Sequence, residues 1–150
     1  MTSWLKQMRE FIKEYPSADI LSQLDIDYTD AVPNCAGLFP SGLVEVKRTT
    51  YINGDVSVLN QCNFALYTVF AKAPNEDEGA TINADWLMDF QKWVQEQSVL
   101  GKTPIFGDEP RNEKIVAQNG AIYSADKEGT AVYAIQISVT FINNYEKGAI

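Results

Sequence analysis

Residues 130–142 read TAVYAIQISVTFI, in which an apolar side chain occupies every second position from Ala131 to Phe141. Successive side chains of a β-strand point to opposite faces of a sheet, so this alternation predicts a strand with one buried face. Residues 113–123 precede it as a second predicted strand, and ADKEGT at residues 125–130 connects the two as a hairpin. The predicted fold is therefore centred on a sheet.

A second, longer hairpin is predicted from residues 43–52 and 55–72, which are rich in β-branched side chains. Asn53 and Gly54 separate the two strands, and both residue types accept the positive φ angles of a type I′ turn. The second strand exceeds the usual length of about 5–6 residues, so we expect a bend or bulge near Asn60 and Gln61. Strands of this length often project as an arm toward a partner.

Two segments show helical periodicity, residues 4–15 and residues 82–99. Thr2 or Ser3 is the expected N-cap of the first helix, and Pro16 is expected to end it. Thr81 or Asn83 is the expected N-cap of the second helix, and Gly101 lies where a C-terminal glycine belongs. The expected apolar faces are formed by Trp4, Leu5, Met8, Phe11, Ile12 and Tyr15, and by Ile82, Trp86, Leu87, Phe90, Trp93 and Val94.

The remaining segments complete the predicted order α-β-β-β-α-β-β. Residues 20–30 are predicted as a short strand, and the segments 31–42, 74–79 and 101–112 as loops or turns because they are rich in Pro, Gly and charged residues. The simplest packing is an α+β fold, a mixed but mostly antiparallel sheet with two helices packed on one face. We expect one domain over residues 1–150, with a flexible C-terminal tail from about residue 143.

Composition excludes several classes of function. The chain has 12 Lys and Arg against 20 Asp and Glu, a formal charge of −8, so its overall field opposes nucleic-acid binding. It has no histidine, which excludes Ser–His and Cys–His nucleophile pairs and histidine ligands for zinc or haem. The N-terminus lacks the apolar core of a signal peptide, and no segment approaches the ~20 apolar residues of a membrane span.

The two cysteines, Cys35 and Cys62, are compatible with a disulfide or with two buried thiols, and we favour buried thiols because no secretion signal is present. No glycine-rich phosphate loop and no Gly-x-Ser-x-Gly motif occurs. The cluster Asp25, Asp27 and Asp30 lacks the glycine and glutamate of a calcium loop. The sequence thus predicts no catalytic residue, no cofactor and no metal, and its long hairpins and surplus apolar surface favour a subunit of an assembly.

Three segments carry a resemblance to a known family. They are ADWLMDFQKWVQEQSVLGKTPIF at residues 84–106, GAIYSADKEGTAVYAIQISVTF at residues 120–141 and NCAGLFPSGLVEV at residues 34–46. Together they resemble small proteins from the structural gene clusters of tailed phages, prophages and contractile-injection elements, described as minor capsid or tail-terminator-like proteins. Some members carry a chloramphenicol-resistance label, but acetyltransferases of that kind use a catalytic histidine, which this chain lacks.

The resemblance implies a non-enzymatic virion protein with the tail-terminator fold, assembled in the cytoplasm of a bacterial host. Such a protein forms a homo-oligomeric ring, hexameric in better-known relatives, at the head-proximal end of the tail tube, where it stops tube polymerisation. Its implied partners are the tail tube protein, head-completion or neck proteins and, as an open possibility, the sheath protein, with no membrane contact. Alternatives are another neck connector, or a small hydrolase or ligand-binding domain that uses carboxylates.

DNA would pass through such a ring without specific binding, because an acidic lining repels phosphate. We therefore expect some of the chain's acidic residues to face the opening, although each of them could equally be an ordinary surface charge. The candidates are Asp25, Asp27, Glu76, Asp77, Glu78, Asp108 and Glu109.

Overall fold

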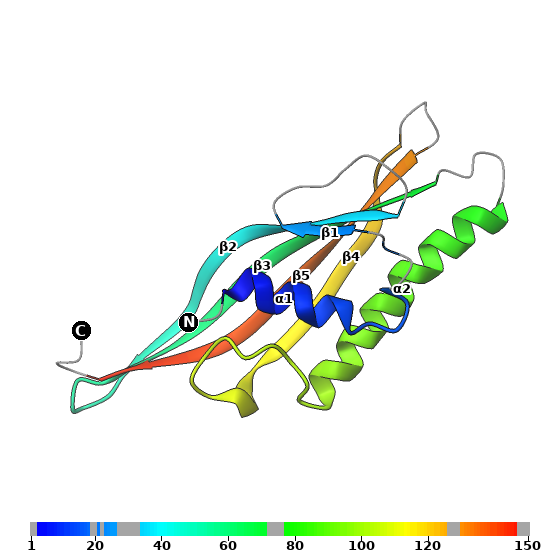
Figure 1. Ribbon diagram of the computed structural model, residues 1–150. Coiled ribbons are helices and arrows are strands. Elements are labelled where there is room, and N and C mark those ends of the chain that lie inside the picture. Colours follow the sequence, from blue (N-terminus) through cyan, green and yellow to red (C-terminus); the bar gives the residue numbers. More distant parts are fainter. Residues whose placement is uncertain are drawn as a thin grey trace.

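The computed structural model describes residues 3–18, 21, 23–26, 34–71, 77–125 and 130–146. It contains a five-stranded sheet with the strand order β1-β2-β3-β5-β4, shown in Figure 1. The strands are β1 (Gln23–Ile26), β2 (Cys35–Thr50), β3 (Val56–Ala71), β4 (Lys114–Ala125) and β5 (Thr130–Tyr145), and the helices are α1 (Trp4–Lys13), α2 (Asp77–Val99) and the short 3-10 helix η2 (Pro110–Asn112). Only β1 and β2 pair in parallel, and the other neighbours are antiparallel.

Both long helices pack on the same face of the sheet. The odd-numbered side chains of β5 share that face with the even-numbered side chains of β3, because Phe141 pairs with Asn60 and Ala131 pairs with Phe70. Trp4 of α1 contacts Phe141 with ring centroids 5.1 Å apart, and Trp86 of α2 contacts Phe70 at 5.4 Å. The predicted fold class, the order of elements and the alternating apolar face of β5 are thus confirmed.

The two helices also contact each other through aromatic side chains. Tyr15 at the end of α1 lies edge-on to Trp86 and Phe90 of α2, and Phe11 packs against Trp93 with ring centroids 4.9 Å apart. The indole nitrogen of Trp86 donates a hydrogen bond to the backbone oxygen of Ser17 at 3.1 Å. The helical spacing of these aromatic residues therefore builds the core, and it joins α1 to α2 as well as to the sheet.

The loop predicted at residues 31–42 is wrong over most of its described part. Strand β2 begins at Cys35 and includes Pro40, which stands opposite Phe64 of β3. Strand β1 pairs only with Cys35–Leu38, so the outer edge of β2 has no neighbouring strand at Pro40 within the described residues. A proline is tolerated at such an edge because its missing N–H breaks no ladder hydrogen bond there. Of the short strand predicted at residues 20–30, only Gln23–Ile26 is described as strand.

The bulge was predicted in the wrong strand. Strands β3 and β5 pair over sixteen residues without a shift, whereas β2 shifts its register against β3 between Pro40 and Gly42 and between Glu45 and Lys47. The second shift lies opposite Asn60, so the irregularity is at the predicted level of the sheet. A central strand must satisfy neighbours on both sides, and an edge strand can absorb an extra residue more easily.

Two predicted details of the local structure are also wrong. Gly54 has a φ angle of 93°, but Asn53 does not have a positive φ, so the turn is not type I′. Tyr51 N–H donates to Asp55 O at 2.8 Å, and Gly54 N–H donates to Tyr51 O at 2.9 Å. These two bonds fit a three-residue loop in which glycine supplies the left-handed conformation.

Of the predicted helix caps, the N-cap of α2 is wrong, whereas Ser3 occupies the N-cap position of α1 as predicted. Helix α2 begins at Asp77, so Thr81 and Asn83 lie inside it and do not cap it. Ser3 is the N-cap of α1 by position, but its side chain makes no capping hydrogen bond. Gly101 does follow α2 with a φ angle of 74°, as predicted for a C-terminal glycine.

The two edge regions of the sheet differ in how their backbone groups are covered. The side chains of α2 satisfy backbone groups of β4, because Ile115 N–H donates to Ser98 Oγ at 3.2 Å and Gln91 Nε2 donates to Ala117 O at 3.2 Å. On the other side, β1 covers only four residues of β2. Within the described residues, β2 therefore keeps an open edge from residue 39 to residue 50.

Candidate interaction surface

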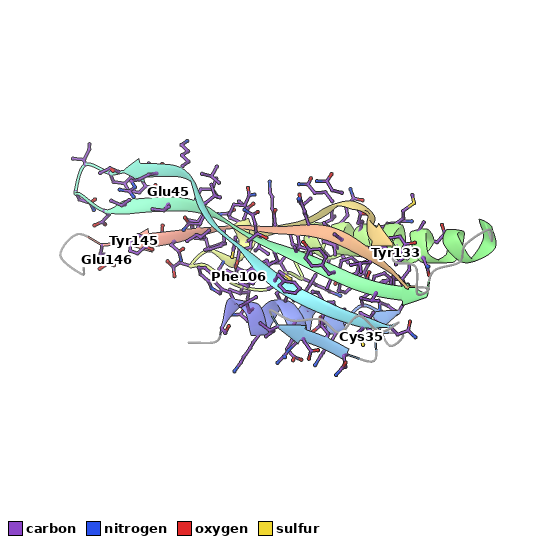
Figure 2. The ribbon with its side chains drawn as sticks, turned by 90° about the horizontal axis from the view of Figure 1, so that it is seen from above. Cys35, Glu45, Phe106, Tyr133, Tyr145 and Glu146 are labelled. Atoms are coloured by element: carbon purple, nitrogen blue, oxygen red, sulfur yellow. The ribbon has the colours of Figure 1, made fainter. Side chains whose placement is uncertain are left out.

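The β2–β3 hairpin and the end of β5 continue beyond the helices as a three-stranded projection. We call residues 43–58 and 143–145 the arm; it extends to the lower left in Figure 1. Strand β4 pairs with β5 only as far as Thr140, so the arm has no fourth strand. Figure 2 shows Glu45 and Tyr145 at the arm end of the molecule, with Phe106 near the middle and Tyr133 toward the opposite end.

The arm exposes apolar side chains on both of its faces. Leu43 stands opposite Cys62, on the face that the helices cover elsewhere, whereas Val44 stands opposite Gln61, on the other face. Of the eleven large apolar side chains exposed among the described residues, six belong to the arm. They are Leu43, Val44, Val46, Tyr51, Ile52 and Tyr145. Exposed apolar groups in one continuous region are typical of a surface that another chain covers.

The helix-side face of the arm is hollowed. A groove of about 360 Å³ is lined by the apolar side chains Leu43, Val56, Val58 and Tyr145 and by the polar side chains Glu45, Arg48 and Asn60. Arg48 Nε lies 2.7 Å from Glu45 Oε1, so these two charges neutralise each other within the arm. Because both groups of this pair are exposed, the pair contributes little to stability.

The end of the arm, which we call the tip (residues 51–55), is held by local hydrogen bonds. Asn53 Nδ2 donates to Asp55 Oδ2 at 2.9 Å, and Asp55 N–H donates to Asn53 Oδ1 at 3.0 Å. These bonds fix the loop in a conformation that leaves Ile52 fully exposed and Tyr51 55% exposed. A branched apolar side chain presented on an ordered loop is arranged for contact with another surface.

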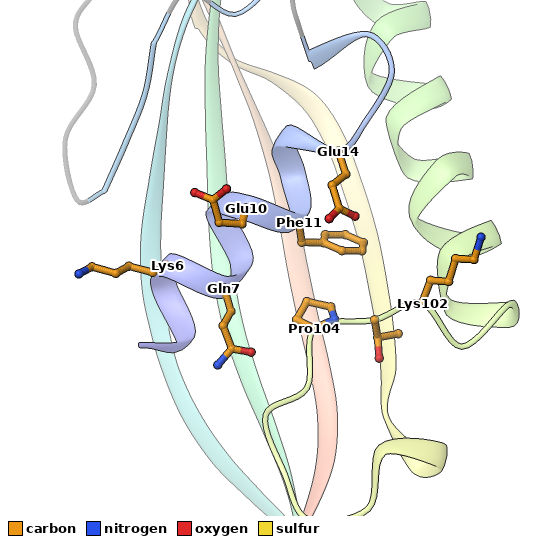
Figure 3. A pocket seen from close by; sticks show the side chains of 8 residues that line it. Lys6, Gln7, Glu10, Phe11, Glu14, Lys102 and Pro104 are labelled. Carbon is orange, nitrogen blue, oxygen red and sulfur yellow. The ribbon is translucent and has the colours of Figure 1, made fainter. Parts of the chain in front are cut away.

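A second groove lies beside α1, and we call it the α1 groove (Figure 3). Its volume is about 500 Å³, and it lies between α1 and the segment that follows α2. Phe11 and Pro104 provide its apolar part. The remaining lining residues are Lys6, Gln7, Glu10, Glu14, Lys102 and Thr103.

The centre of the sheet face opposite the helices is lined by amide and hydroxyl side chains. Ser138 Oγ donates to Asn63 Oδ1 at 2.7 Å, and Gln61 Nε2 donates to the same oxygen at 2.8 Å. A shallow hollow of about 430 Å³ on this face is also bordered by Gln118 and Gln136. Amide and hydroxyl groups offer no fixed cation to a phosphate backbone.

Two carboxylates hold the loop between α2 and β4: Asp108 fastens it to the base of the arm, and Glu113 joins two parts of the loop to each other. Asn144 N–H donates to Asp108 Oδ2 at 2.7 Å, and Asp108 N–H donates to Ile142 O at 2.7 Å. Glu113 is buried and accepts hydrogen bonds from the backbone N–H groups of Phe106 and Gly107. Burial raises the pKa of Glu113 above its ordinary value, and these two hydrogen bonds oppose that rise only in part.

No sequence motif singles out Glu113. The sequence shows only that Glu113 is an acidic residue at the start of a predicted strand, and many ordinary surface carboxylates occupy such positions. The role of Glu113 depends on residues 106 and 107 turning back toward it, and this is a tertiary contact.

The candidate acidic residues do not form one cluster on a single subunit. Asp25 is half-buried beside Gly37, at the level of Ala134 on β5, whereas Asp108 is exposed beside Ile142. Eight residues along one strand correspond to about 27 Å. Glu109 is half-buried next to Asp108. Asp77 and Glu78 open α2 but their side chains are not described, and Asp27 and Glu76 lie outside the described residues.

Among the described residues, no group of three or more His, Cys, Asp or Glu side chains is arranged to hold a metal ion. In the same part of the chain, no helix has the length and apolarity needed to cross a membrane.

Cys35 and Cys62 are both buried and are not joined by a disulfide. Burial raises the pKa of Cys62 from 9.0 to about 11, which reduces its thiolate fraction about 100-fold at neutral pH. We expect an aromatic disulfide reagent at pH 8 to react with neither thiol in the folded chain and with both thiols in guanidinium chloride. Absorbance of the released thiolate measures this, and fast reaction of one thiol in the folded chain would contradict the described burial.

No family model matches this chain, and no curated protein matches it in sequence.

Proposed function

We propose that this chain is a structural subunit of a phage or phage-like tail, which closes into a ring and caps the head-proximal end of the tail tube. The observation that carries the proposal is the arm, which is uncovered on both faces and holds six of the eleven exposed large apolar side chains of the described residues. A subunit that acts by assembly needs such a surface, and the resemblance in sequence supplies the kind of assembly.

The physical argument concerns the cost of an uncovered arm. A narrow ribbon of strands without a packed layer is only marginally stable in water, and apolar groups on both faces add an unfavourable contact with solvent. Covering the arm with another chain removes that cost. In a closed ring, each subunit presents one surface to one neighbour and a different surface to the other, so the arm and its receiving surface must differ.

The ring would act through its shape. The strand edge of β2, charged at Glu45, Lys47 and Arg48 and interrupted by two register shifts, resists uncontrolled pairing with further strands. A capping ring needs this property because each subunit must contact one neighbour on each side and must bind no further strand. The net charge of −8 is compatible with DNA passing without being held.

The test is tube length in a polymerisation assay with the tube protein from the same gene cluster. Wild-type chain, added during polymerisation, is expected to shorten the tubes and to appear as a ring at one end in electron micrographs. Double substitution Leu43→Asp and Val46→Asp places charges on the exposed arm and is expected to abolish capping while the circular dichroism spectrum stays unchanged.

Met88→Asp is the matched control, because Met88 is 67% exposed on α2 and lies outside the arm. It should cap tubes as the wild type does. Folded wild-type chain that leaves tube length unchanged would refute the proposal. Binding to a head-completion protein without any effect on tubes would favour a different neck connector.

A further inference from the structure

We infer that Asn53 at the tip is a site of spontaneous deamidation, whereas Asn119, which is also followed by glycine, is protected by the sheet. The chain contains these two Asn-Gly pairs, Asn53–Gly54 and Asn119–Gly120. The inference does not depend on the proposed function, because it concerns the chemistry of the tip itself.

The reaction needs only water and the two residues of the pair. The backbone nitrogen of the residue after asparagine loses its proton to solvent hydroxide and attacks the side-chain carbon Cγ, and the bond from Cγ to Nδ2 breaks so that ammonia leaves. Water then opens the resulting cyclic imide at either carbonyl, which yields aspartate or isoaspartate. One water is consumed and one ammonia is released, without oxidation. Glycine favours the attack because it has no side chain to shield its nitrogen.

The tip leaves Asn53 open to this reaction. Asn53 is exposed, and both of its side-chain hydrogen bonds are made to Asp55 within the tip. Asp55 N–H donates to Asn53 Oδ1 at 3.0 Å, so a donor already faces the oxygen on which negative charge develops when Cγ is attacked. The bond from Gly54 N–H to Tyr51 O must break before the nitrogen can attack. Because this bond lies in a hairpin loop at the end of the arm, local opening releases it without disturbing the rest of the sheet.

Asn119 has the same sequence signal in different surroundings. It lies within β4, whose pairing with β5 holds the backbone on both sides of it. Its Nδ2 donates to Gln136 Oε1 at 3.0 Å. Gly120 lies directly against Gln91 Oε1 of α2, where even a single added carbon would collide. The movement that brings the Gly120 nitrogen to Cγ therefore requires β4 to open from β5 and from α2, and no such opening is required at the tip.

Deamidation at residue 53 changes the loop that it occurs in. Asn53 Nδ2 donates to Asp55 Oδ2 at 2.9 Å, and a carboxylate in place of the amide brings two negative charges together there. Isoaspartate also lengthens the backbone by one carbon, in a loop whose two backbone hydrogen bonds fit three residues. Both products therefore loosen the loop that presents the fully exposed Ile52.

Peptide mapping by mass spectrometry tests the inference on the folded wild-type chain, incubated for days in mildly alkaline buffer. Residue 53 is expected to gain the mass of an amide-to-acid conversion and to elute as separate aspartate and isoaspartate peptides. Residue 119 is the internal control and should convert at least about 10-fold more slowly, because its reactive form requires local opening of the sheet. In guanidinium chloride the two residues should convert at similar rates, since the sequence signal is the same.

Asn53→Gln is the matched variant, because glutamine keeps an amide but forms the corresponding larger ring much more slowly. It should abolish conversion at residue 53 and leave conversion at residue 119 unchanged. Equal conversion of the two residues in the folded chain would overturn the inference, as would conversion of residue 119 alone. Conversion of neither residue in the folded chain, with conversion of both in guanidinium chloride, would overturn it too, since the tip would then protect Asn53 as well as the sheet protects Asn119. Each of these outcomes leaves the proposed function to be decided separately by tube length.

Discussion

Replacing Phe141 by alanine is expected to lower the free energy of unfolding by about 3–5 kcal/mol. Phe141 is fully buried in β5, where its ring lies 5.1 Å from the ring of Trp4 and 5.7 Å from that of Phe106. Removing it leaves a cavity beneath α1 and the loop after α2, and both segments lose an aromatic partner. Denaturation in urea, followed by tryptophan fluorescence, measures the change.

Tyr145→Ala is the matched control for this substitution. Tyr145 is an aromatic residue on the same face of the same strand, but it lies in the arm and is 43% exposed. We expect a change of about 0.5 kcal/mol, as for other surface substitutions. Equal losses of unfolding free energy in the two variants would contradict the conclusion that the core of the sheet ends where its helical cover ends.

Replacing Glu113 by alanine is expected to cost about 1–3 kcal/mol, because the buried N–H of Phe106 loses its acceptor. The N–H of Gly107, 3.3 Å from the same oxygen, loses its acceptor as well. Since residue 106 packs against Trp4 and Phe64, the loop and the end of α1 should loosen together. Hydrogen exchange at residues 104–108 would locate the effect.

Glu113→Gln separates the hydrogen bonds from the charge. The glutamine side chain keeps an oxygen acceptor for the two N–H groups but cannot ionise. Burial raises the pKa of Glu113 in the folded chain, so below the ordinary value of 4.5 the carboxyl is neutral in both the folded and the unfolded states. Above that value the unfolded state ionises first, and the wild type loses stability until the pH passes the raised pKa.

The expected result is therefore a pH-dependent difference between two stability curves. The stability of the wild type relative to Glu113→Gln should fall as the pH rises from 4.5 through the raised pKa, and it should be constant below and above this window. Urea denaturation of both proteins across that range measures it. A difference that does not vary with pH would show that the carboxyl keeps its ordinary pKa in the folded chain.

Much of the fold could be predicted from local patterns. The alternation from Ala131 to Phe141 and the helical spacing of Trp86, Leu87, Phe90 and Val94 both identify buried faces. A side chain's direction follows from the period of its own element, so one sequence suffices to predict it. Gly101 was predictable for the same reason, since the chain leaves a helix there by a conformation that glycine favours.

The candidate surfaces could be predicted only in part. The length of the second hairpin indicated an arm, but the apolar exposure of Leu43 follows from where α1 and α2 end relative to the sheet. The α1 groove combines residues 6–14 with residues 102–104, which no short motif connects. The seven candidate acidic residues share only their residue type, and type alone does not determine how far apart two side chains lie.

The sequence by itself determined the secondary-structure order, the buried faces, the absence of histidine chemistry and the position of the hairpin turn. Tertiary structure alone decided that β2 accepts Pro40 at an open edge, that Glu113 holds the loop after α2, and that the arm extends beyond its helical cover. The first group of features depends on interactions between residues that are close together in the sequence. The second depends on contacts between distant segments, where packing of the whole chain selects one arrangement from several that are locally acceptable.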